Sequence, residues 1–253
     1  MRISLLQTDI VWGDPSANQV KAGEMLKSLP KSDVYVLPEM FSTGFATQPE
    51  GLAEEDESSL RWMKMMAANL DAAIAGSVAT CVVTDGKKSY HNRFYFVKPD
   101  GTCEYYDKLH LFTYGGEHHR FTPGEKKVVV EFRGVRFLLQ VCYDMRFPVF
   151  ARNNDVTPYD VALYVASWPT SRIDAWTVLA HARAIENQCY VAAVDRVGTD
   201  PSCEYCGGTM LIDAYGKTVA ECERDKECGI TADIDMEALA EFRRKFPVLN
   251  DAD

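Results

Sequence analysis

Short runs of apolar, β-branched and aromatic residues recur along the whole 253-residue chain, separated by polar or turn-forming stretches. Runs of about four to eight such residues are typical of buried β-strands. Their positions predict strands at residues 2–8, 33–37, 72–79, 92–97, 127–132, 135–142, 161–167, 189–195, 209–213 and 229–234.

Other segments place apolar residues at helical spacing. In residues 58–70, Met63, Met66 and Leu70 fall on one helical face, which we interpret as core packing. Helices are also predicted at residues 16–29 and 172–188, and the tail after about residue 235 is expected to form a short helix and then an extended end.

Strand and helix patterns alternate, and several strand pairs are separated by turn-like stretches that contain Gly86, Gly101 or Gly216. Mixed βα units and hairpins favour an α/β or α+β layered fold. The chain has 47% hydrophobic residues, enough for a sizeable core, and shows no repeat, low-complexity tract or linker. We therefore expect residues 1–253 to form a single domain, with a C-terminal tail from about residue 236.

The charge balance bears on possible partners. The formal net charge is -10, and no run of lysine and arginine could follow a phosphate backbone, so nucleic acid is not an expected partner. The N-terminal segment lacks the long apolar stretch of a signal peptide, and no stretch approaches the roughly 20 apolar residues of a membrane span. We expect a soluble cytoplasmic protein that does not bind membranes.

The eight cysteines are expected to be free thiols, because a chain with its own core and no secretion signal fits a reducing compartment. Cys203 and Cys206 have the spacing of a zinc-ligand pair. The next two cysteines, Cys222 and Cys228, are separated by five residues rather than two, which weakens the match. We therefore predict no metal site.

Three polar residues stand out against their apolar surroundings. Cys142 ends the run RFLLQVC, Glu39 follows VYVLP, and Lys108 lies inside EYYDKLHLF. Alone, each has an ordinary explanation: a packed cysteine, a solvated acid and a lysine with its head in water. Together they suit nucleophilic catalysis, because a carboxylate can accept the thiol proton and an ammonium can stabilise an oxyanion. A Cys–His dyad is left open by the histidines near this lysine in sequence, His110, His118 and His119.

The chain resembles the nitrilase, or carbon–nitrogen hydrolase, superfamily. The resemblance rests on segments that follow one another in the family's order, LLQTDIVWGDPSANQ, VLPEMFSTGF, YDKLHLF, QVCYDMRFPVFAR, SWPTSRIDAW, ARAIENQCYVAAVDRVG and GGTMLIDAYG. It implies a four-layer αββα sandwich and a triad of Glu39, Lys108 and Cys142. It also implies a second glutamate near the lysine, which corresponds to Glu117 in TYGGEHHRFTPG.

Four segments, FSTGF, KLHLF, CYDMRFP and SWPTSRIDAW, look most like the ω-amidase branch of that superfamily. Its members hydrolyse the terminal amide of 2-oxoglutaramate or 2-oxosuccinamate and release ammonia. The resemblance therefore implies a small carboxylate-bearing amide as substrate, a cysteine thioester, no metal or organic cofactor, and a homodimer. The alternatives are a nitrilase or N-carbamoyl amidase with the same triad, and a non-catalytic binding subunit.

Substrate recognition is expected around the nucleophile turn and the SWPTSR loop. The resemblance implies that the backbone N–H of Tyr143 holds the oxyanion together with Lys108. Arg172 lies at the start of a predicted helix and is a candidate for binding the substrate carboxylate, with pairing to Asp174 as the alternative. Apolar walls are predicted from three aromatic residues, Phe41, Tyr114 and Trp168.

Two ion pairs are predicted to have structural roles. Asp144 and Arg146 are expected to pair within the turn and to fix the nucleophile. Arg183 and Glu186 lie three residues apart on one predicted helix, a spacing at which opposite charges meet.

Overall fold

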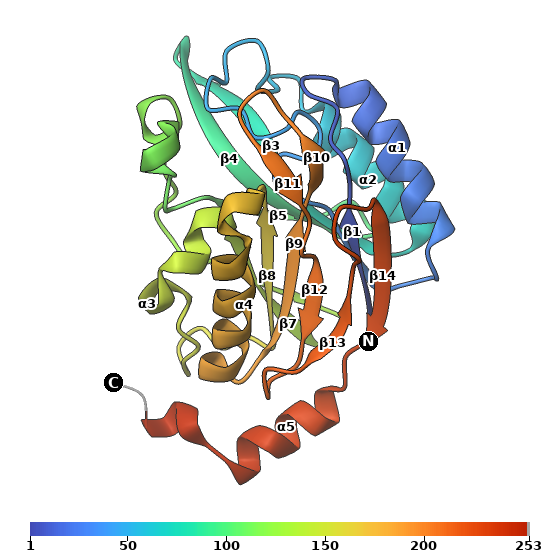
Figure 1. Ribbon diagram of the computed structural model, residues 1–253, viewed down its shortest axis with the longest axis vertical. Coiled ribbons are helices and arrows are strands. Elements are labelled where there is room, and N and C mark those ends of the chain that lie inside the picture. Colours follow the sequence, from blue (N-terminus) through green and yellow to red (C-terminus); the bar gives the residue numbers. More distant parts are fainter. Residues whose placement is uncertain (252–253) are drawn as a thin grey trace.

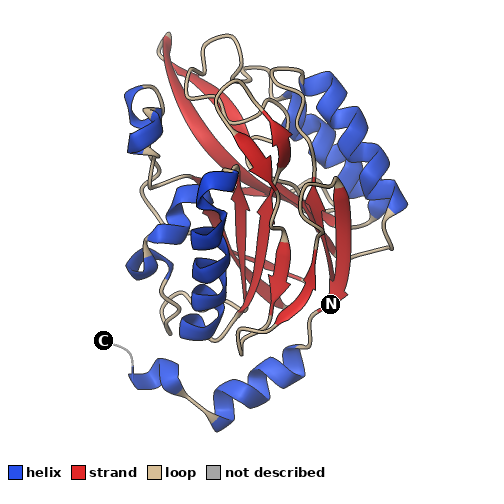
Figure 2. Cartoon of the chain, viewed as in Figure 1, coloured by secondary structure: helices blue, strands red, loops and turns tan. Residues whose placement is uncertain are grey.

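The computed structural model describes residues 1–251 as two six-stranded β-sheets packed face to face, with helices on both outer sides (Figures 1 and 2). This is the four-layer αββα arrangement expected from the resemblance. None of the helices within residues 1–251 is long and apolar enough to cross a membrane.

The first sheet has the strand order β14-β1-β2-β3-β4-β5. Strand β2 is parallel to both of its neighbours, and the remaining pairs are antiparallel. The strands are β1 (Arg2–Gln7), β2 (Val34–Val36), β3 (Ala73–Thr84), β4 (Lys87–Val97), β5 (Cys103–Asp107) and β14 (Cys228–Asp233).

The second sheet has the order β13-β12-β9-β8-β7-β6. Its strands are β6 (Val129–Phe132), β7 (Val135–Val141), β8 (Val161–Ala166), β9 (Tyr190–Asp195), β12 (Met210–Ile212) and β13 (Thr218–Glu221). A separate two-stranded ribbon consists of β10 (Val197–Thr199) and β11 (Glu204–Cys206). Strands β7, β8 and β9 are parallel to one another, so their carboxyl ends lie at the same edge of the sheet.

Helices α1 (Pro15–Ser28) and α2 (Ser58–Leu70) cover the first sheet, and α3 (Pro148–Ala151) and α4 (Ile173–Asn187) lie on the second (Figure 1). Helix α5 (Met236–Lys245) forms most of the C-terminal tail. Local sequence explains two of the starts, since Asp14 and Asp235 accept hydrogen bonds from the first turns of α1 and α5. Single-turn 3₁₀ segments complete the structure, namely η1 (Thr113–Gly115), η2 (Glu117–His119), η3 (Cys142–Arg146), η4 (Thr170–Arg172) and η5 (Val248–Asp251).

The largest apolar cluster fills the space between the sheets and extends under α4. Phe96 of the first sheet and Phe137 of the second are in contact there, with ring centroids 5.3 Å apart. Burying such a side chain is worth about 1.5–3 kcal/mol. A second cluster joins α1 and α2 to the outer face of the first sheet and includes Met63 and Met66, which confirms the predicted apolar face. Together these clusters provide a rigid support for the strand ends.

All the predicted strand segments contain observed strand residues, but the sequence reading missed β5, β10, β11 and β13. It also ended β3 too early, because the strand runs on to Thr84 in a long hairpin with β4. The missed strands are short or partly exposed, so they lack the continuous apolar run that marks a buried strand. The tail is a helix and a 3₁₀ turn as far as residue 251, whereas an extended end was predicted.

Candidate active site

Cys142 lies at the carboxyl end of β7 and opens the η3 turn with a positive φ of 47°. This conformation is costly for a non-glycine residue, by about 1–3 kcal/mol, and persists only when neighbouring contacts enforce it. Asp144 provides such contacts, because its buried carboxylate accepts hydrogen bonds from Val141 N (2.9 Å), the Tyr106 hydroxyl (2.8 Å) and His110 N (3.1 Å). The turn therefore fixes the direction of the thiol.

The predicted ion pair between Asp144 and Arg146 was wrong. The Asp144 carboxylate is also 2.7 Å from Nδ1 of His110. Its oxygens therefore already have hydrogen-bond partners in His110, the Tyr106 hydroxyl and Val141 N. The Arg146 guanidinium instead lies over the Trp168 ring, 4.8 Å from its centroid. By contrast, the predicted pair of Arg183 and Glu186 is confirmed at 2.8 Å.

Three charged side chains are completely buried in contact with one another: Glu39, Lys108 and Glu117. Nζ of Lys108 is 3.0 Å from Oε1 of Glu39 and 2.9 Å from Oε2 of Glu117. The structure thus brings together the lysine and both glutamates that were singled out in the sequence. Two carboxylates share one ammonium in a site without solvent access.

Different parts of the chain hold these groups. Glu39 follows β2, Lys108 follows β5, and Glu117 belongs to η2. Backbone groups fix two of them, because Lys108 N donates to the carbonyl of Asn92 (3.0 Å) and Phe112 N donates to Oε2 of Glu117 (2.6 Å). The three segments meet only in the folded protein.

Asn92 is a member of the site that sequence reasoning missed. Its side-chain amide donates to Oε1 of Glu39 at 2.7 Å and to Oε1 of Glu117 at 3.2 Å. A signal was present, because strand alternation from Phe94 and Phe96 puts Asn92 on the core face. A buried amide in that position must find partners, and here the partners are the two glutamates.

Burial and charge shift the protonation of the cluster in opposite directions. Burial by itself disfavours a charged ammonium, but Glu117 and Glu39 outweigh it and raise the pKa of Lys108. Burial raises the pKa of Glu117, although Lys108 opposes the shift. Burial, reinforced by Glu39, raises the pKa of the Cys142 thiol well above its ordinary value, and Lys108 opposes this too. The thiol is therefore protonated at rest, and its attack on a substrate requires a base.

The first residue after β8, Ser167, lies between the carboxylate and the pocket. Its backbone N–H donates to Oε2 of Glu39 at 2.8 Å. Ser167 also lines the same pocket as Cys142. The backbone of this residue therefore connects Glu39 with the pocket that the thiol borders.

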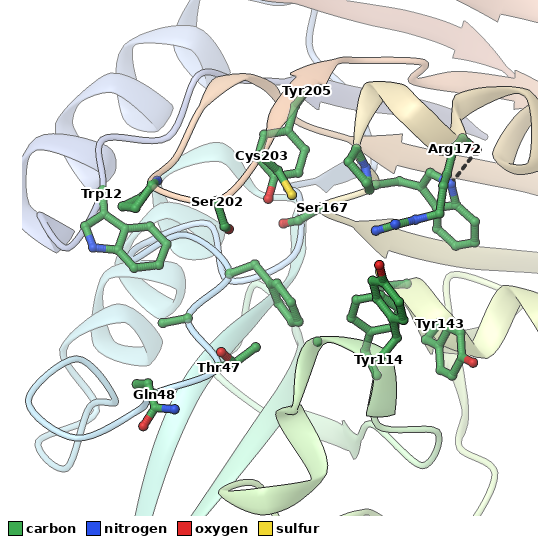
Figure 3. Close-up of a pocket in the computed structure, with 18 of the residues that line it drawn as sticks. Trp12, Thr47, Gln48, Tyr114, Tyr143, Ser167, Arg172, Ser202, Cys203 and Tyr205 are labelled. Carbon is green, nitrogen blue, oxygen red and sulfur yellow. Dashed lines mark hydrogen bonds between the residues drawn. The ribbon is translucent and has the colours of Figure 1, made fainter.

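A pocket of about 830 Å³ opens in front of Cys142. Its lining includes Tyr143, Tyr114, Trp168 and Arg172, as predicted, while the buried charged cluster is not part of the wall. Figure 3 shows the Arg172 side chain reaching into the pocket close to Tyr114, with Trp12 and Gln48 at the opposite end. The thiol is thus the one member of the predicted triad that borders the pocket.

Phe41 does not line the pocket, which corrects the prediction made for it. Its ring packs against Trp62 of α2, with centroids 5.5 Å apart, in the outer apolar cluster. Phe45, four residues later, takes the predicted position on the wall, and its ring centroid is 5.1 Å from Nζ of Lys108. Sequence spacing alone could not distinguish the two rings.

The pocket contains two guanidinium groups, Arg146 and Arg172. Arg172 lies over the rings of Phe112 (5.3 Å) and Tyr114 (5.8 Å), and Trp168 donates from Nε1 to its carbonyl at 2.7 Å. Neither arginine is within 4.0 Å of a carboxylate among residues 1–251, so the alternative pairing of Arg172 with Asp174 is not seen. Both guanidinium groups are available to an anionic ligand.

No histidine in the described part of the chain lines the pocket. His110 is hydrogen-bonded to Asp144 and stacked on Phe147, and His118 and His119 are exposed. The alternative of a Cys–His dyad therefore has no geometric support.

The four cysteines considered for zinc do not form one cluster. Cys203 lines the pocket, whereas Cys222 directly follows β13 and Cys228 begins β14. Within residues 1–251, no three His, Cys, Asp or Glu side chains are grouped so that they could hold a metal ion.

This arrangement of a strand-end thiol, a buried carboxylate and a fixed ammonium suits acyl transfer through a covalent intermediate. Residues 2–244 match the family model of the carbon-nitrogen hydrolases. The chain is 44% identical to the omega-amidase YafV of Yersinia enterocolitica, over 100% of this chain and 97% of that protein. It is 37% identical to a 2-oxoglutaramate amidase of Bacillus subtilis, over 98% and 96% of the two proteins.

A solved structure supports the same assignment. The crystal structure of XC1258 from Xanthomonas campestris, described as a CN-hydrolase superfamily protein with an arsenic adduct in the active site, matches with a TM-score of 0.95. The two sequences are 43% identical, and the match covers 100% of this chain and 97% of that one. The chain therefore belongs to the carbon–nitrogen hydrolase family and is an amide-hydrolysing enzyme of the nitrilase superfamily.

Proposed function

We propose that this enzyme hydrolyses the terminal amide of a small 2-oxo dicarboxylate ω-amide, such as 2-oxoglutaramate, to the free acid and ammonia. The observation that carries the proposal is the lining of the pocket. It includes a strand-end thiol and two guanidinium groups that have no carboxylate partner among residues 1–251. Arginine binds carboxylates through two parallel hydrogen bonds, so the pair suits a substrate with an acid group remote from the amide. The names of the two curated relatives point to the same substrate class.

In the first step, Glu39 accepts the proton of Cys142 and the sulfur attacks the amide carbon. Lys108 and the backbone N–H of Tyr143 stabilise the negative oxygen of the tetrahedral intermediate, where one such donor is worth about 3–4 kcal/mol. The carbon–nitrogen bond then breaks, the nitrogen takes the proton from Glu39, and ammonia leaves. A thioester on Cys142 results.

In the second step, a water molecule gives a proton to Glu39 and its oxygen attacks the thioester carbon. The carbon–sulfur bond breaks, the proton returns to Cys142, and the free acid is released. Glu117 orients Lys108 throughout, because it holds the ammonium at 2.9 Å. Every proton that moves in this scheme passes through Glu39, whose two oxygens are held by Lys108, Asn92 and Ser167.

Substrate selection is assigned to the pocket wall. Arg172 and Arg146 would bind the distal carboxylate, and the rings of Trp168 and Tyr114 would cover the short carbon chain between the two ends. Both guanidinium groups rest on aromatic rings, which limits their motion before the substrate binds.

The test is ammonia release from 2-oxoglutaramate, succinamate, glutamine, a simple nitrile and an N-carbamoyl amino acid. We expect turnover to be fastest on 2-oxoglutaramate and to disappear in Cys142→Ala. Cys103→Ala is the matched control, because this thiol on β5 lies outside the pocket and burial raises its pKa to about 11. Full activity of Cys142→Ala would overturn the mechanism.

The same panel separates the alternatives. Faster turnover of the nitrile or the carbamoyl compound would keep the cysteine mechanism and replace the substrate. If folded protein with a reduced Cys142 releases no ammonia from any of these compounds, the result would favour a non-catalytic binding subunit.

A separate test addresses the carboxylate. Arg172→Met and Arg146→Met keep most of the side-chain volume and remove the charge, so KM for 2-oxoglutaramate should rise by roughly 10- to 100-fold, as expected for loss of a charge-assisted hydrogen bond. If both variants keep the wild-type KM, the carboxylate is bound elsewhere. The homodimer, the cytoplasmic location and the single domain stay predictions, to be tested by sedimentation, cell fractionation and limited proteolysis.

A further inference from the structure

Asp195 is a buried acid beside the active site that the mechanism above does not use. It ends β9, directly opposite Ala166 of β8, while Val141 of β7 pairs with Val165. Because the three strands are parallel, Cys142, Ser167 and Asp195 lie at neighbouring positions on one edge of the sheet. The carboxyl group of Asp195 is completely buried.

Asp195 is hydrogen-bonded to Trp168, the residue after Ser167. Its Oδ1 accepts from the backbone N–H of Trp168 at 2.8 Å and from that of Arg196 at 2.9 Å. Glu39 accepts from the preceding amide, that of Ser167, at 2.8 Å. Two consecutive N–H groups of one loop are thus held by two different buried carboxyl groups.

The loop held in this way contacts both halves of the pocket. The Ser167 amide donates to Glu39 at 2.8 Å, and Ser167 lines the pocket together with Cys142. The Trp168 ring supports the Arg146 guanidinium at 4.8 Å, and its Nε1 donates to the carbonyl of Arg172 at 2.7 Å. A displacement of this loop would therefore disturb the thiol's neighbours and the carboxylate site together.

The electrostatic setting suits a neutral acceptor. Burial raises the pKa of Asp195 well above its ordinary value, and nearby Glu39 adds to the shift, whereas the amides of Trp168 and Arg196 oppose it. The Arg196 guanidinium is directed elsewhere, to the carbonyls of Ile10 and Thr199. Oδ2 of Asp195 has no hydrogen-bond partner among residues 1–251. An uncharged side chain with the same acceptor would therefore fit.

We propose that Asp195 is a positioning residue for the hydrolysis: through the Trp168 amide it holds the Ser167–Trp168 loop, and with it the geometry of Cys142 and of the two arginines. The effect of Asp195 on turnover rests on the proposed function, and kcat measures it. The effect of Asp195 on the position of Cys142 does not rest on that function, and the alkylation rate measures it.

The test compares three variants by kcat, KM, thermal midpoint and the rate at which iodoacetamide alkylates Cys142, followed by peptide mass spectrometry. Asp195→Asn keeps the acceptor and should stay within about threefold of the wild type in every rate. Asp195→Leu keeps the volume but loses the acceptor, so kcat should fall by about 100-fold, the loss expected when a reacting group is misplaced by roughly 1 Å. Alkylation of Cys142 should change in Asp195→Leu and not in Asp195→Asn.

Thr209→Val controls for damage to the strand end alone. The Thr209 hydroxyl accepts from the backbone N–H of Asp195 and donates to its carbonyl, and within residues 1–251 it makes no hydrogen bond to Trp168. This variant should lower the thermal midpoint and leave kcat unchanged. If Asp195→Leu does not fold, Asp195→Ala takes its place.

Two results would overturn the inference: wild-type kcat and alkylation in Asp195→Leu, or an equal loss in Asp195→Asn, which would show that the acceptor is not what matters. A wild-type protein that turns over no substrate of the panel would refute the proposed function instead. In that case the alkylation rates still decide whether Asp195 positions Cys142.

Discussion

Strand β7 connects two clusters of charge with opposite properties. Near the start of the strand, Arg136 forms an ion pair with Asp160, and Arg243 of α5 forms a second ion pair with the same aspartate. The far end of the strand leads into Cys142, and the charges of Glu39, Lys108 and Glu117 act on the pKa of this thiol. Both clusters combine acidic and basic side chains, but the pKa of Asp160 is lowered in the first and the pKa of Glu117 is raised in the second.

At the first end, positive charges outnumber negative ones, since two arginines bind one aspartate. Asp160 receives two hydrogen bonds from the Arg136 guanidinium (2.9 and 2.7 Å), one from the Arg136 backbone (3.1 Å) and one from Arg243 (2.9 Å). Although burial opposes the shift, these bonds lower the pKa of Asp160. The result is an acid that stays ionised and ties the C-terminal helix to the sheet.

At the other end, two carboxylates share one ammonium, and burial raises the pKa of Glu117. Such a cluster is poorly compensated, which makes it weak as a structural element. Glu39, which we propose as the base for the thiol, belongs to this cluster. The two clusters differ in charge balance: two arginines surround one carboxylate at the first end, whereas one lysine serves two carboxylates at the other.

The strongest way to break the comparison is Lys108→Met. Without the ammonium, the oxyanion loses a donor and two buried carboxylates lose their partner, so kcat should fall by about 10³-fold. Ammonia release from the best substrate measures the loss. Lys127→Met is the control, because Lys127 is a partly buried lysine whose pKa burial lowers to about 8, and its ammonium donates to the carbonyl of Arg152 rather than to a carboxylate. Equal losses in both variants would contradict a special role for Lys108.

A smaller effect is expected from Asn92→Leu. The variant keeps the volume and removes the amide that holds both glutamates, so kcat should fall by roughly 10- to 100-fold through misplaced carboxylates. Asn153→Leu is the control, since Asn153 is equally buried and bonds the carbonyls of Tyr159 and Asn187 away from the pocket. That control should lose stability and keep its turnover per folded molecule. An unchanged kcat in Asn92→Leu would remove Asn92 from the site.

The opposite behaviour is expected at the other cluster. Asp160→Asn should lower the free energy of unfolding by about 2 kcal/mol, because hydrogen bonds to a charged acceptor are lost, and should leave turnover per folded molecule unchanged. Urea unfolding measures the first quantity. Asp233→Asn, which breaks the exposed pair with Arg2, should lower the free energy of unfolding less than Asp160→Asn does. A drop in kcat with Asp160→Asn would mean that the two ends of β7 are coupled.

The smallest expected effect is the pH dependence of the difference in unfolding free energy between the wild type and Asp160→Asn. The pKa of Asp160 is lower in the folded protein than its ordinary value, so its contribution to stability is fully present above about pH 4 and is lost as the pH falls through the folded pKa. The gap in unfolding free energy between wild type and Asp160→Asn should be constant from pH 7 to about pH 5 and shrink below about pH 4. A gap that grows on acidification would reverse the assigned sign.

Much of the molecule was predictable because the information is local. Apolar runs mark the buried strands, and helical spacing marks the face of α2 that carries Met63 and Met66, since both periodicities follow from backbone geometry. The family motifs indicated Glu39, Lys108, Cys142 and Glu117, and the fold brings the lysine into contact with both glutamates. The missed strands, such as β10 and β11, are short and owe their pairing to the rest of the fold.

The sequence by itself therefore determined the order of most elements, the layered fold and the family to which the chain belongs. The tertiary structure alone decided which side chains meet. It placed Phe45 rather than Phe41 on the pocket wall, turned Arg146 away from Asp144 and onto Trp168, and put Asn92 between two glutamates. The physical reason is that a side chain's partner depends on the register and twist of strands far away in sequence, which no local pattern contains.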